Sequence, residues 1–426
     1  MSSQFRGAHL PRRVVVTGIG AVAPNGNDRE SFWRASLSGE SGVARIASFD
    51  PAGLDSRVAG EVKRFDTDAW IPRKDRQHVP RIAPLALAAS REALADAALL
   101  DAAGLLLEPR RLGVVLGCGG GALEFTERQY AHYFRGDIRR ASVYVIPSST
   151  TGTVASEISI AYGIKGPSHV LSDGCTSSTD ALGYAFESIR WGRQDRLLSG
   201  GVDATISHGI LTGFCLMKVL STARNEEPQR ASRPFDRDRD GFVLGEGSWM
   251  LVLEEREQAM ERGARVYGEI AGYGATCDAY HRVRLEDEGE EPARAMTLAM
   301  QDASSDPSEV GYLSLHGTST RLNDVVETRA VKRAFGTFAG RLPMSALKSI
   351  IGHPQGACGA AGVAATLLGM RDGRFHPTLN LDQPDPECDL DYIPHRAREL
   401  QVEVALCNCI GFGSKNAALV LRRHRT

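Results

Sequence analysis

The sequence has 426 residues, of which 42% are hydrophobic, and its formal net charge is −2. This length and composition predict a large core shared between two domain-sized halves. The nearly balanced charge gives no sign of nucleic acid binding. No segment approaches the roughly 20 apolar residues that cross a membrane, and the N-terminus lacks the apolar centre of a signal peptide. We therefore expect a cytoplasmic protein that does not bind membranes.

The eight cysteines are scattered along the chain without the spacing of a disulfide framework, which favours a reducing compartment. Cys407 and Cys409 form a close pair in a segment whose pattern is typical of a strand. No second pair of ligand residues accompanies them, so we expect no zinc there. We expect no other metal site.

The first elements along the chain follow apolar patterns. Residues 14–16 predict a strand. The glycine-rich run TGIGAVAPNG that follows predicts a plain turn, because it lacks the third glycine and the later acidic residue of a dinucleotide-binding motif. Residues 27–80 are polar and indicate irregular structure with short helices. Residues 83–100 predict a strong amphipathic helix, and residues 114–116 predict the next strand.

The segment around Cys175 organises the chain. Residues 169–171 predict a short buried strand, and the apolar residues between 182 and 189 have the spacing of a helix with one buried face, which ends near Gly192. Cys175 therefore lies on a tight strand-to-helix turn, where Gly174 permits backbone angles that a side chain would forbid. A thiol at a helix N-terminus faces free N–H groups and the positive end of the helix dipole, which favours the reactive thiolate. A buried structural cysteine is the alternative.

Three further segments follow the cysteine helix. Residues 196–204 predict a strand, and residues 247–255 predict another. Between them, residues 221–247 are polar, and most of their charges are typical of a solvent-exposed surface. Their many glycines and paired Asp and Arg residues predict a loop of fixed conformation.

The two halves of the chain repeat the same elements in the same order. The run TGIGAVAP near the start is matched by AGYGATCD from residue 271, and each is followed by a helix, a proline and a strand. Cys175 precedes Gly192 by 17 residues, and Gly356 precedes Gly373 by the same 17 residues. We therefore expect an internal duplication of an α/β unit about a pseudo-two-fold axis. Chance similarity is the alternative, because βα patterns are common.

Such an axis brings four segments to one central cleft, since ligands bind at the carboxyl ends of parallel strands. These segments are residues 174–178, 315–324, 347–359 and 407–416. His316 and His353 lie there beside glycines, and a cysteine with nearby imidazoles is the pattern of covalent acyl chemistry. Neutral imidazoles can also donate hydrogen bonds to an oxyanion or enolate. Lys348 either orients this site through its charge or is a surface lysine, and the loop GFGSKN either completes an oxyanion hole or is a plain turn.

At these residues the sequence resembles the β-ketoacyl-acyl carrier protein synthases of the thiolase superfamily, over roughly residues 12–423. The motifs are DGCTSSTDA, HGTSTRLND, KSIIGHPQGACGAAG and GFGSKN. Several segments look most like the catalytic α subunit of bacterial type II polyketide ketosynthases, and ISIAYGIKGPS looks as much like the elongating fatty-acid enzyme. The resemblance implies a thiolase-like α/β fold of five αβαβα layers. Its N-terminal half, 12–262, would carry the cysteine, and its C-terminal half, 263–423, the histidines and the lysine.

The resemblance also implies a decarboxylative Claisen condensation. Cys175 would accept an acyl chain from the phosphopantetheine thioester of an acyl carrier protein. His316 and His353 would assist the loss of carbon dioxide from malonyl-carrier protein and stabilise the enolate, and Lys348 would hold the histidine pair. Further implied roles are an oxyanion hole made by the backbone N–H groups of Cys175 and Phe412, an aromatic gate at Phe412, and phosphopantetheine contacts at Thr318 and Thr320. No cofactor is implied beyond the phosphopantetheine of the carrier.

One position departs from the family pattern. Fatty-acid and aromatic-polyketide members usually carry a glutamate nine residues after the second histidine, where this chain has Gly362. Modular polyketide ketosynthases often have glycine there, so we hypothesise a reduced or polyene-type polyketide pathway. Three alternatives remain open: fatty-acid elongation, a non-catalytic chain-length factor, which typically lacks the nucleophile, and a degradative thiolase, which needs a second catalytic cysteine near Cys407 or Cys409.

The resemblance further predicts partners. Family members are dimers in which the strand before the cysteine, around residues 168–173, commonly pairs across the interface. We expect a dimer with a second copy or with a homologous chain-length factor. An acidic carrier protein should dock on Lys and Arg residues near the mouth of the cleft, which the sequence does not identify.

Overall fold

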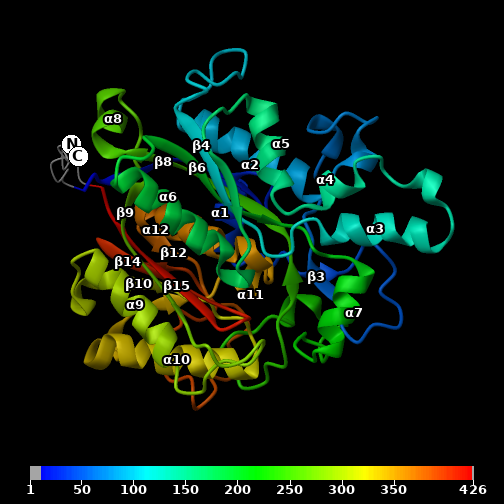
Figure 1. Cartoon of the computed structure of the whole chain (residues 1–426). Helices are drawn as coiled ribbons and strands as arrows, with labels where there is room; N and C mark the ends of the chain where they lie inside the picture. The colour runs from blue at the N-terminus through cyan, green and yellow to red at the C-terminus, as the bar shows by residue number, and fades with distance from the viewer. Residues whose placement is uncertain (1–10, 425–426) are drawn as a thin grey trace, which may run out of the picture.

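The computed structural model describes residues 11–424, and within that range ten strands form one continuous sheet (Figure 1). Their order is β11-β10-β14-β15-β9-β1-β8-β6-β4-β5. Their bounds are β1 (Val14–Val22), β4 (Leu112–Gly117), β5 (Ser168–Leu171), β6 (Arg196–Asp203), β8 (Gly247–Glu255), β9 (Gly268–Cys277), β10 (Val310–Ser314), β11 (Met344–Ser345), β14 (Val404–Gly411) and β15 (Lys415–Arg422). The smaller sheets contain β2 (Ala44–Arg45), β3 (Val58–Gly60) and β7 (Leu244–Gly245), and β12 (Arg374–Phe375) and β13 (Arg398–Glu399).

The large sheet consists of two matching halves. In the first, β4 is parallel to β5 and β6, whereas β6 and β1 are antiparallel to β8. In the second, β10 is parallel to β11 and β14, whereas β14 and β9 are antiparallel to β15. The halves join where residues 14–16 of β1 pair with residues 268–270 of β9. This correspondence, strand for strand, confirms the predicted duplication.

Helices cover both halves of the sheet and fill the space between them (Figure 1). The longer helices are α1 (Arg29–Ser38), α2 (Ile82–Asp96), α3 (Leu123–Phe134), α5 (Thr153–Tyr162), α6 (Ser177–Arg190), α7 (His208–Leu216), α9 (Glu290–Asp302), α10 (Arg321–Phe335) and α12 (Cys358–Asp372). The short ones are α4 (Val145–Ser149), α8 (Arg256–Glu261) and α11 (Lys348–Ile351). Helices α2 and α5 pack on the outside of the first half, α9 and α10 on the outside of the second, and α6 and α12 lie between them. The predicted five-layer αβαβα fold is thus present.

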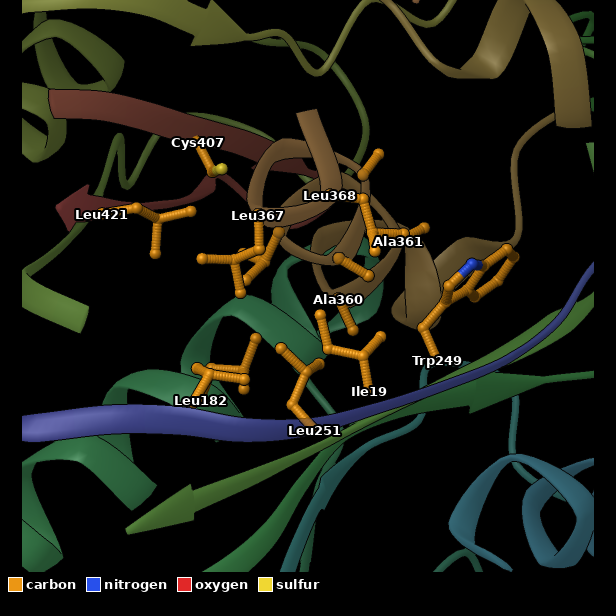
Figure 2. Packing of buried hydrophobic residues seen from close by; sticks show 14 of the residues in the cluster. Ile19, Leu182, Trp249, Leu251, Ala360, Ala361, Leu367, Leu368, Cys407 and Leu421 are labelled. Atoms are coloured by element: carbon orange, nitrogen blue, oxygen red, sulfur yellow. The ribbon is translucent and has the colours of Figure 1, made fainter. Parts of the chain in front are cut away.

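The middle layer contains the largest apolar core (Figure 2). Ile19 of β1 and Leu251 of β8 pack beside Leu182 of α6. Ala360 and Leu367 of α12 lie against the same group, and small alanines allow this helix to be buried on all sides. Because α6 and α12 both enter this layer at their N-termini, the residues that precede them are brought together from the two halves.

The glycines at the start of each half lie inside strands, so the predicted turn is wrong for residues 17–22. It is present only at the end of the run, where Ala23 and Gly26 exchange two backbone hydrogen bonds. Gly18 and Gly20 belong to β1, and a Cβ atom on either would collide with backbone carbonyl oxygens of α2. Gly272 and Gly274 of β9 meet carbonyl oxygens of α9 in the same way. The glycines therefore allow a helix to pack directly on a strand, and their repetition is part of the duplication.

Other elements agree with the sequence or differ for a simple reason. The predicted helix at 83–100 is α2, and the strand at 114–116 is β4. Strand β5 before the cysteine is present, but its residues are exposed or half-buried because β5 is the edge of the sheet, so the prediction of a buried strand is wrong. The polar residues 221–247 do form a fixed loop, in which buried Arg233 pairs with Asp236. No helix within residues 11–424 is long and apolar enough to cross a membrane.

Candidate active site

The four predicted segments meet around one cavity of about 250 Å³. Its walls include Cys175, His316, Thr318, Thr320, His353 and Phe412. Cys175 lies in a single turn of 3₁₀ helix between β5 and α6, and it is 5% exposed. Gly174, with φ of +67°, makes the turn that points the cysteine into the cavity. The predicted strand-to-helix placement of Cys175 is therefore confirmed.

His353 lies closest to the thiol. Its Nε2 atom is 3.2 Å from Sγ of Cys175, although the two residues are 178 positions apart. Gly352, with φ of +73°, reverses the chain after α11. The backbone N–H of His353 donates to the carbonyl of Val243, and Gly245 donates to the carbonyl of His353. The fixed polar loop thus holds the histidine against the cysteine.

His316 follows β10, and its ring lies 5.4 Å from that of His353 at an angle of 85°. Buried Glu327 of α10 fixes this position, because its carboxylate accepts the backbone N–H groups of His316 and Gly317, both at 2.7 Å. Asn408 donates to the same carboxylate at 2.7 Å. Sequence reasoning missed Glu327. An acidic residue among the apolar positions of a buried helix face was the signal that could have identified it.

Lys348 is buried behind the histidines and does not line the main cavity. Its Nζ atom donates to the carbonyl of His316 at 2.6 Å and contacts Nδ1 of the same ring at 3.2 Å. An ammonium has no lone pair, so Nδ1 must accept, and the ring proton of His316 then lies on Nε2. Burial and the charge of Lys348 lower the pKa of His316 and His353 well below the usual 6.5, which keeps both rings neutral.

Cys175 is a thiol in the resting site, contrary to the predicted thiolate. Burial and, to a lesser extent, the neighbouring Cys358 raise its pKa to about 12, while Lys348 and the N–H of Phe412 only partly oppose these effects. The α6 dipole is therefore outweighed by desolvation. Nε2 of His353 at 3.2 Å is placed to take the proton during reaction.

This protonation state predicts a steep pH dependence for alkylation of Cys175. Only the thiolate reacts, so the rate with iodoacetamide should keep rising from neutral pH to about pH 10. Peptide mapping of the modified Cys175 at each pH measures this rate separately from that of the other cysteines. A plateau below about pH 8 would show instead that the thiolate is the resting form.

The remaining predicted residues line the same cavity. The backbone N–H of Phe412 contacts the thiol of Cys175, as an oxyanion-hole donor should. The hydroxyls of Thr318 and Thr320 lie 2.9 Å apart at the cavity wall. Gly362 lies in α12 beside Ser314, outside the main cavity.

Sequence reasoning also missed residues that pack behind the cysteine. The sulfur atoms of Cys358 and Cys409 lie 3.3 and 3.2 Å from the carbonyl oxygen of Cys175. Asp203, at the end of β6, accepts the N–H of Gly356 at 2.7 Å and those of two glycines after β4, so that it ties the two halves together. Only the duplicated topology brings these positions close, and no local pattern signals them.

Thiols and imidazoles are also metal ligands. Among the described residues, Cys175, His316 and His353 lie close enough to share an ion, as do His316, Cys358 and Cys409. The ammonium of Lys348 lies against His316, however, and its charge disfavours a second cation in this buried space. We therefore assign no metal to either group.

Comparison with known proteins identifies the family. Residues 11–259 match the model of the beta-ketoacyl synthase N-terminal domain, and residues 267–382 match that of the C-terminal domain. The 3-oxoacyl-[acyl-carrier-protein] synthase 2 of Synechocystis sp. is 40% identical over 97% of this chain and 99% of its own length. Two solved structures are similar over 97% of this chain and 100% of theirs. A type II polyketide ketosynthase in complex with its acyl-carrier protein has a TM-score of 0.89 at 34% identity, and the ishigamide ketosynthase/chain length factor has 0.88 at 31%. The chain therefore belongs to the beta-ketoacyl synthase family of condensing acyltransferases.

Proposed function

We propose that this chain catalyses the decarboxylative Claisen condensation of a malonyl thioester with an acyl chain held on Cys175, both substrates being carried on the phosphopantetheine of an acyl carrier protein. The observation that carries this proposal is the meeting of one thiol and two neutral imidazoles at a single cavity. No further cofactor is part of the proposal, since decarboxylation itself supplies the carbanion.

The first step loads the acyl chain. The sulfur of Cys175 attacks the thioester carbonyl while Nε2 of His353 takes the thiol proton. The backbone N–H groups of Cys175 and Phe412 stabilise the oxyanion. When the intermediate collapses, the phosphopantetheine sulfur leaves, and His353 returns the proton to it. The products are an acyl-enzyme and the free thiol of the carrier.

The second step joins the chains. Malonyl-carrier protein enters, and the bond between its carboxylate and methylene carbon breaks to release carbon dioxide. The electron pair forms an enolate, whose oxygen accepts hydrogen bonds from Nε2–H of His316 and from His353 in the tautomer that carries its proton on Nε2. The methylene carbon then attacks the acyl group, and the sulfur of Cys175 leaves as a thiolate that takes up a proton. Lys348 and Glu327 hold His316 during this step.

Three other roles are proposed for the cavity wall. Thr318 and Thr320 contact the phosphopantetheine arm, and Phe412 forms a gate between the cysteine and the malonyl group. A thiolase reaction is less well supported, because Cys409 lies behind the carbonyl of Cys175 and does not line the main cavity. The presence of the nucleophile and both imidazoles also disfavours a non-catalytic chain-length factor.

We propose type II polyketide biosynthesis as the pathway. The similar ketosynthase structures support it, whereas the similarity to 3-oxoacyl-[acyl-carrier-protein] synthase 2 supports fatty-acid elongation. Gly362 departs from the usual glutamate of fatty-acid and aromatic-polyketide members alike and favours a reduced or polyene-type product. The test is intact-mass analysis of products made from malonyl-carrier protein and several acyl primers, with and without the neighbouring gene product. Extension of polyunsaturated or β-keto primers, once or repeatedly, supports a polyketide role. A single extension of saturated primers alone supports fatty-acid elongation.

The carrier protein should dock at the mouth of the cavity. Arg284 lines the mouth, and three exposed basic residues lie beside other lining residues: Lys218, Arg282 and Arg321. We predict that Arg284→Glu raises KM for the acyl-carrier substrate by roughly 3- to 10-fold while kcat is retained, because an acidic partner is repelled. Arg341→Glu, an exposed site away from the cavity, is the matched control. Equal kinetics for both variants would contradict docking at this mouth.

We also propose a dimer, formed through the surface beside the sheet edge β5. Helix α3 exposes Tyr133 and Phe134, and residues 143–146 add exposed apolar groups. Helix α3 packs on α4, α4 on α5 and α5 on β5, so these exposed apolar residues belong to elements that lead to the strand at the sheet edge. Exposed apolar residues gathered on neighbouring elements indicate a protein interface. The partner is a second copy or a homologous chain-length factor.

Replacing Phe134 and Val143 by aspartate should therefore convert the dimer to a monomer, as measured by light scattering. The exposed fractions of these side chains are 79% and 80%, so the monomer itself should fold. Met260→Asp on α8, far from this surface, is the control. A wild-type chain that is monomeric both alone and with the neighbouring gene product would contradict the proposal.

A further inference from the structure

Lys348 is a buried cation without a carboxylate partner. Its side chain is only 5% exposed, and its hydrogen-bond acceptors at His316 are a carbonyl oxygen and a neutral ring nitrogen. Among residues 11–424, no carboxylate oxygen lies within the 4.0 Å of Nζ that defines a salt bridge. Burying an ammonium without an anion is costly, so another group near Nζ should carry negative charge.

Cys358 is positioned to be that group. Cys358 and Lys348 line the same small cavity beside the main one, close enough for the ammonium to interact with the sulfur. The thiol of Cys409 lies 3.6 Å from Sγ of Cys358 and can donate its proton to a thiolate. Cys358 is also the first residue of α12, where the helix dipole favours negative charge.

The charges around Cys358 agree with this assignment. Burial raises its pKa, but the hydrogen bond from Cys409 and the ammonium of Lys348 outweigh burial, and the pKa falls to about 7. The opposing group is Asp203, whose carboxylate is held by three backbone N–H groups. The other groups that face Cys358 are the carbonyl oxygen and the thiol of Cys175 and the neutral ring of His316.

We propose that Cys358 is a thiolate that neutralises Lys348 and so keeps the ammonium against His316. Cys358 is then a positioning residue, which acts through Lys348 and touches no substrate. The thiolate also explains why Cys175 is a thiol, since one anion opposes the formation of a second beside it. The effect on catalysis rests on the proposed condensation, whereas the charge on Cys358 does not.

The charge on Cys358 is tested by following the ultraviolet absorbance of thiolate as the pH is raised. This measurement does not depend on enzyme activity. Wild-type protein should show one thiolate appearing near pH 7, and this step should be missing from Cys358→Ser. In Lys348→Met the step should move to alkaline pH. Cys407→Ala is the matched control, because Cys407 lines the same cavity but burial raises its pKa to about 12. A step that persists in Cys358→Ser would overturn the proposal.

The positioning role is tested by restoring the charge. We expect Cys358→Ser to lower the condensation rate by about 10- to 100-fold, as displacement of a catalytic group does, and to change its pH profile. Cys358→Asp should recover most of the rate. Gly362→Glu in the Cys358→Ser background should recover it too, because residue 362 lies one helical turn further along α12 and lines the same cavity. Full activity of Cys358→Ser, or failure of both carboxylates to recover the rate, would overturn the role. If the Cys358 thiolate is detected but the wild-type protein catalyses no condensation, the proposed condensation is wrong and the charge on Cys358 stands.

Discussion

Replacing Cys175 by alanine should abolish the acyl-enzyme and lower the condensation rate by about 1,000-fold or more, which is typical when a nucleophile is lost. The sulfur forms the only covalent bond between enzyme and acyl chain in the proposed reaction. Loss of carbon dioxide from malonyl-carrier protein should continue, because both imidazoles and Lys348 keep their places without the thiol. Cys175→Ala should therefore lose acyl loading but retain decarboxylation.

Mass spectrometry of the protein after incubation with acyl-carrier protein measures the first reaction, and labelled carbon dioxide release measures the second. Cys388→Ala is a matched control, since this cysteine is buried in the outer core of the second half, away from the cavity. It should load acyl groups like the wild-type protein. Acyl-enzyme formation by Cys175→Ala would remove the assigned nucleophile, and a simultaneous loss of both reactions would point to damage of the whole site.

Removal of either imidazole should instead slow the loss of carbon dioxide. We expect His316→Ala and His353→Ala to lower decarboxylation by about 100- to 1,000-fold each, which is the usual cost of one donor to an oxyanion. His353→Ala should also slow acyl loading, because Nε2 of His353 lies 3.2 Å from the sulfur. His316→Ala should load normally, because the contacts of His316 are with Lys348 and Glu327.

His376→Gln is the control for these variants. His376 is buried and its pKa is lowered to about 4 by burial, but it contacts Ser345 and does not line the cavity. It should retain both partial reactions if the protein folds. Full decarboxylation by His353→Ala would remove that residue's assigned role, and normal loading by the same variant would remove its role as the base.

Local patterns predicted the elements that carry the site. The helical spacing after Cys175 and the repeated order of elements were sufficient to place the cysteine and both histidines at one cleft. These predictions succeeded because apolar periodicity reflects which face is buried. The predicted turn failed for residues 17–22 because the glycines there allow a helix to pack on β1, and a linear pattern does not show this packing partner.

Properties that depend on how deeply a side chain is buried, or on contacts with residues far away in the sequence, could not be predicted. The thiol state of Cys175 depends on complete burial and on Cys358, which is 183 residues away in the sequence. The contact between Glu327 and the backbone of His316 required the position of α10. Strand β5 was predicted correctly as a strand, but its exposure follows from its place at the sheet edge, which is a property of the whole topology.

The central claim is that one sulfur and two imidazoles at a single cavity extend an acyl chain, and a chase experiment tests it most directly. Acyl-enzyme is isolated, malonyl-carrier protein is added, and the masses of enzyme and carrier are followed together. We predict that the acyl mass leaves Cys175 and appears on the carrier as a β-ketoacyl chain longer by two carbons, with one carbon dioxide released per transfer. Acyl-enzyme that persists, or that is hydrolysed while the carrier gains no longer chain, would contradict the claim.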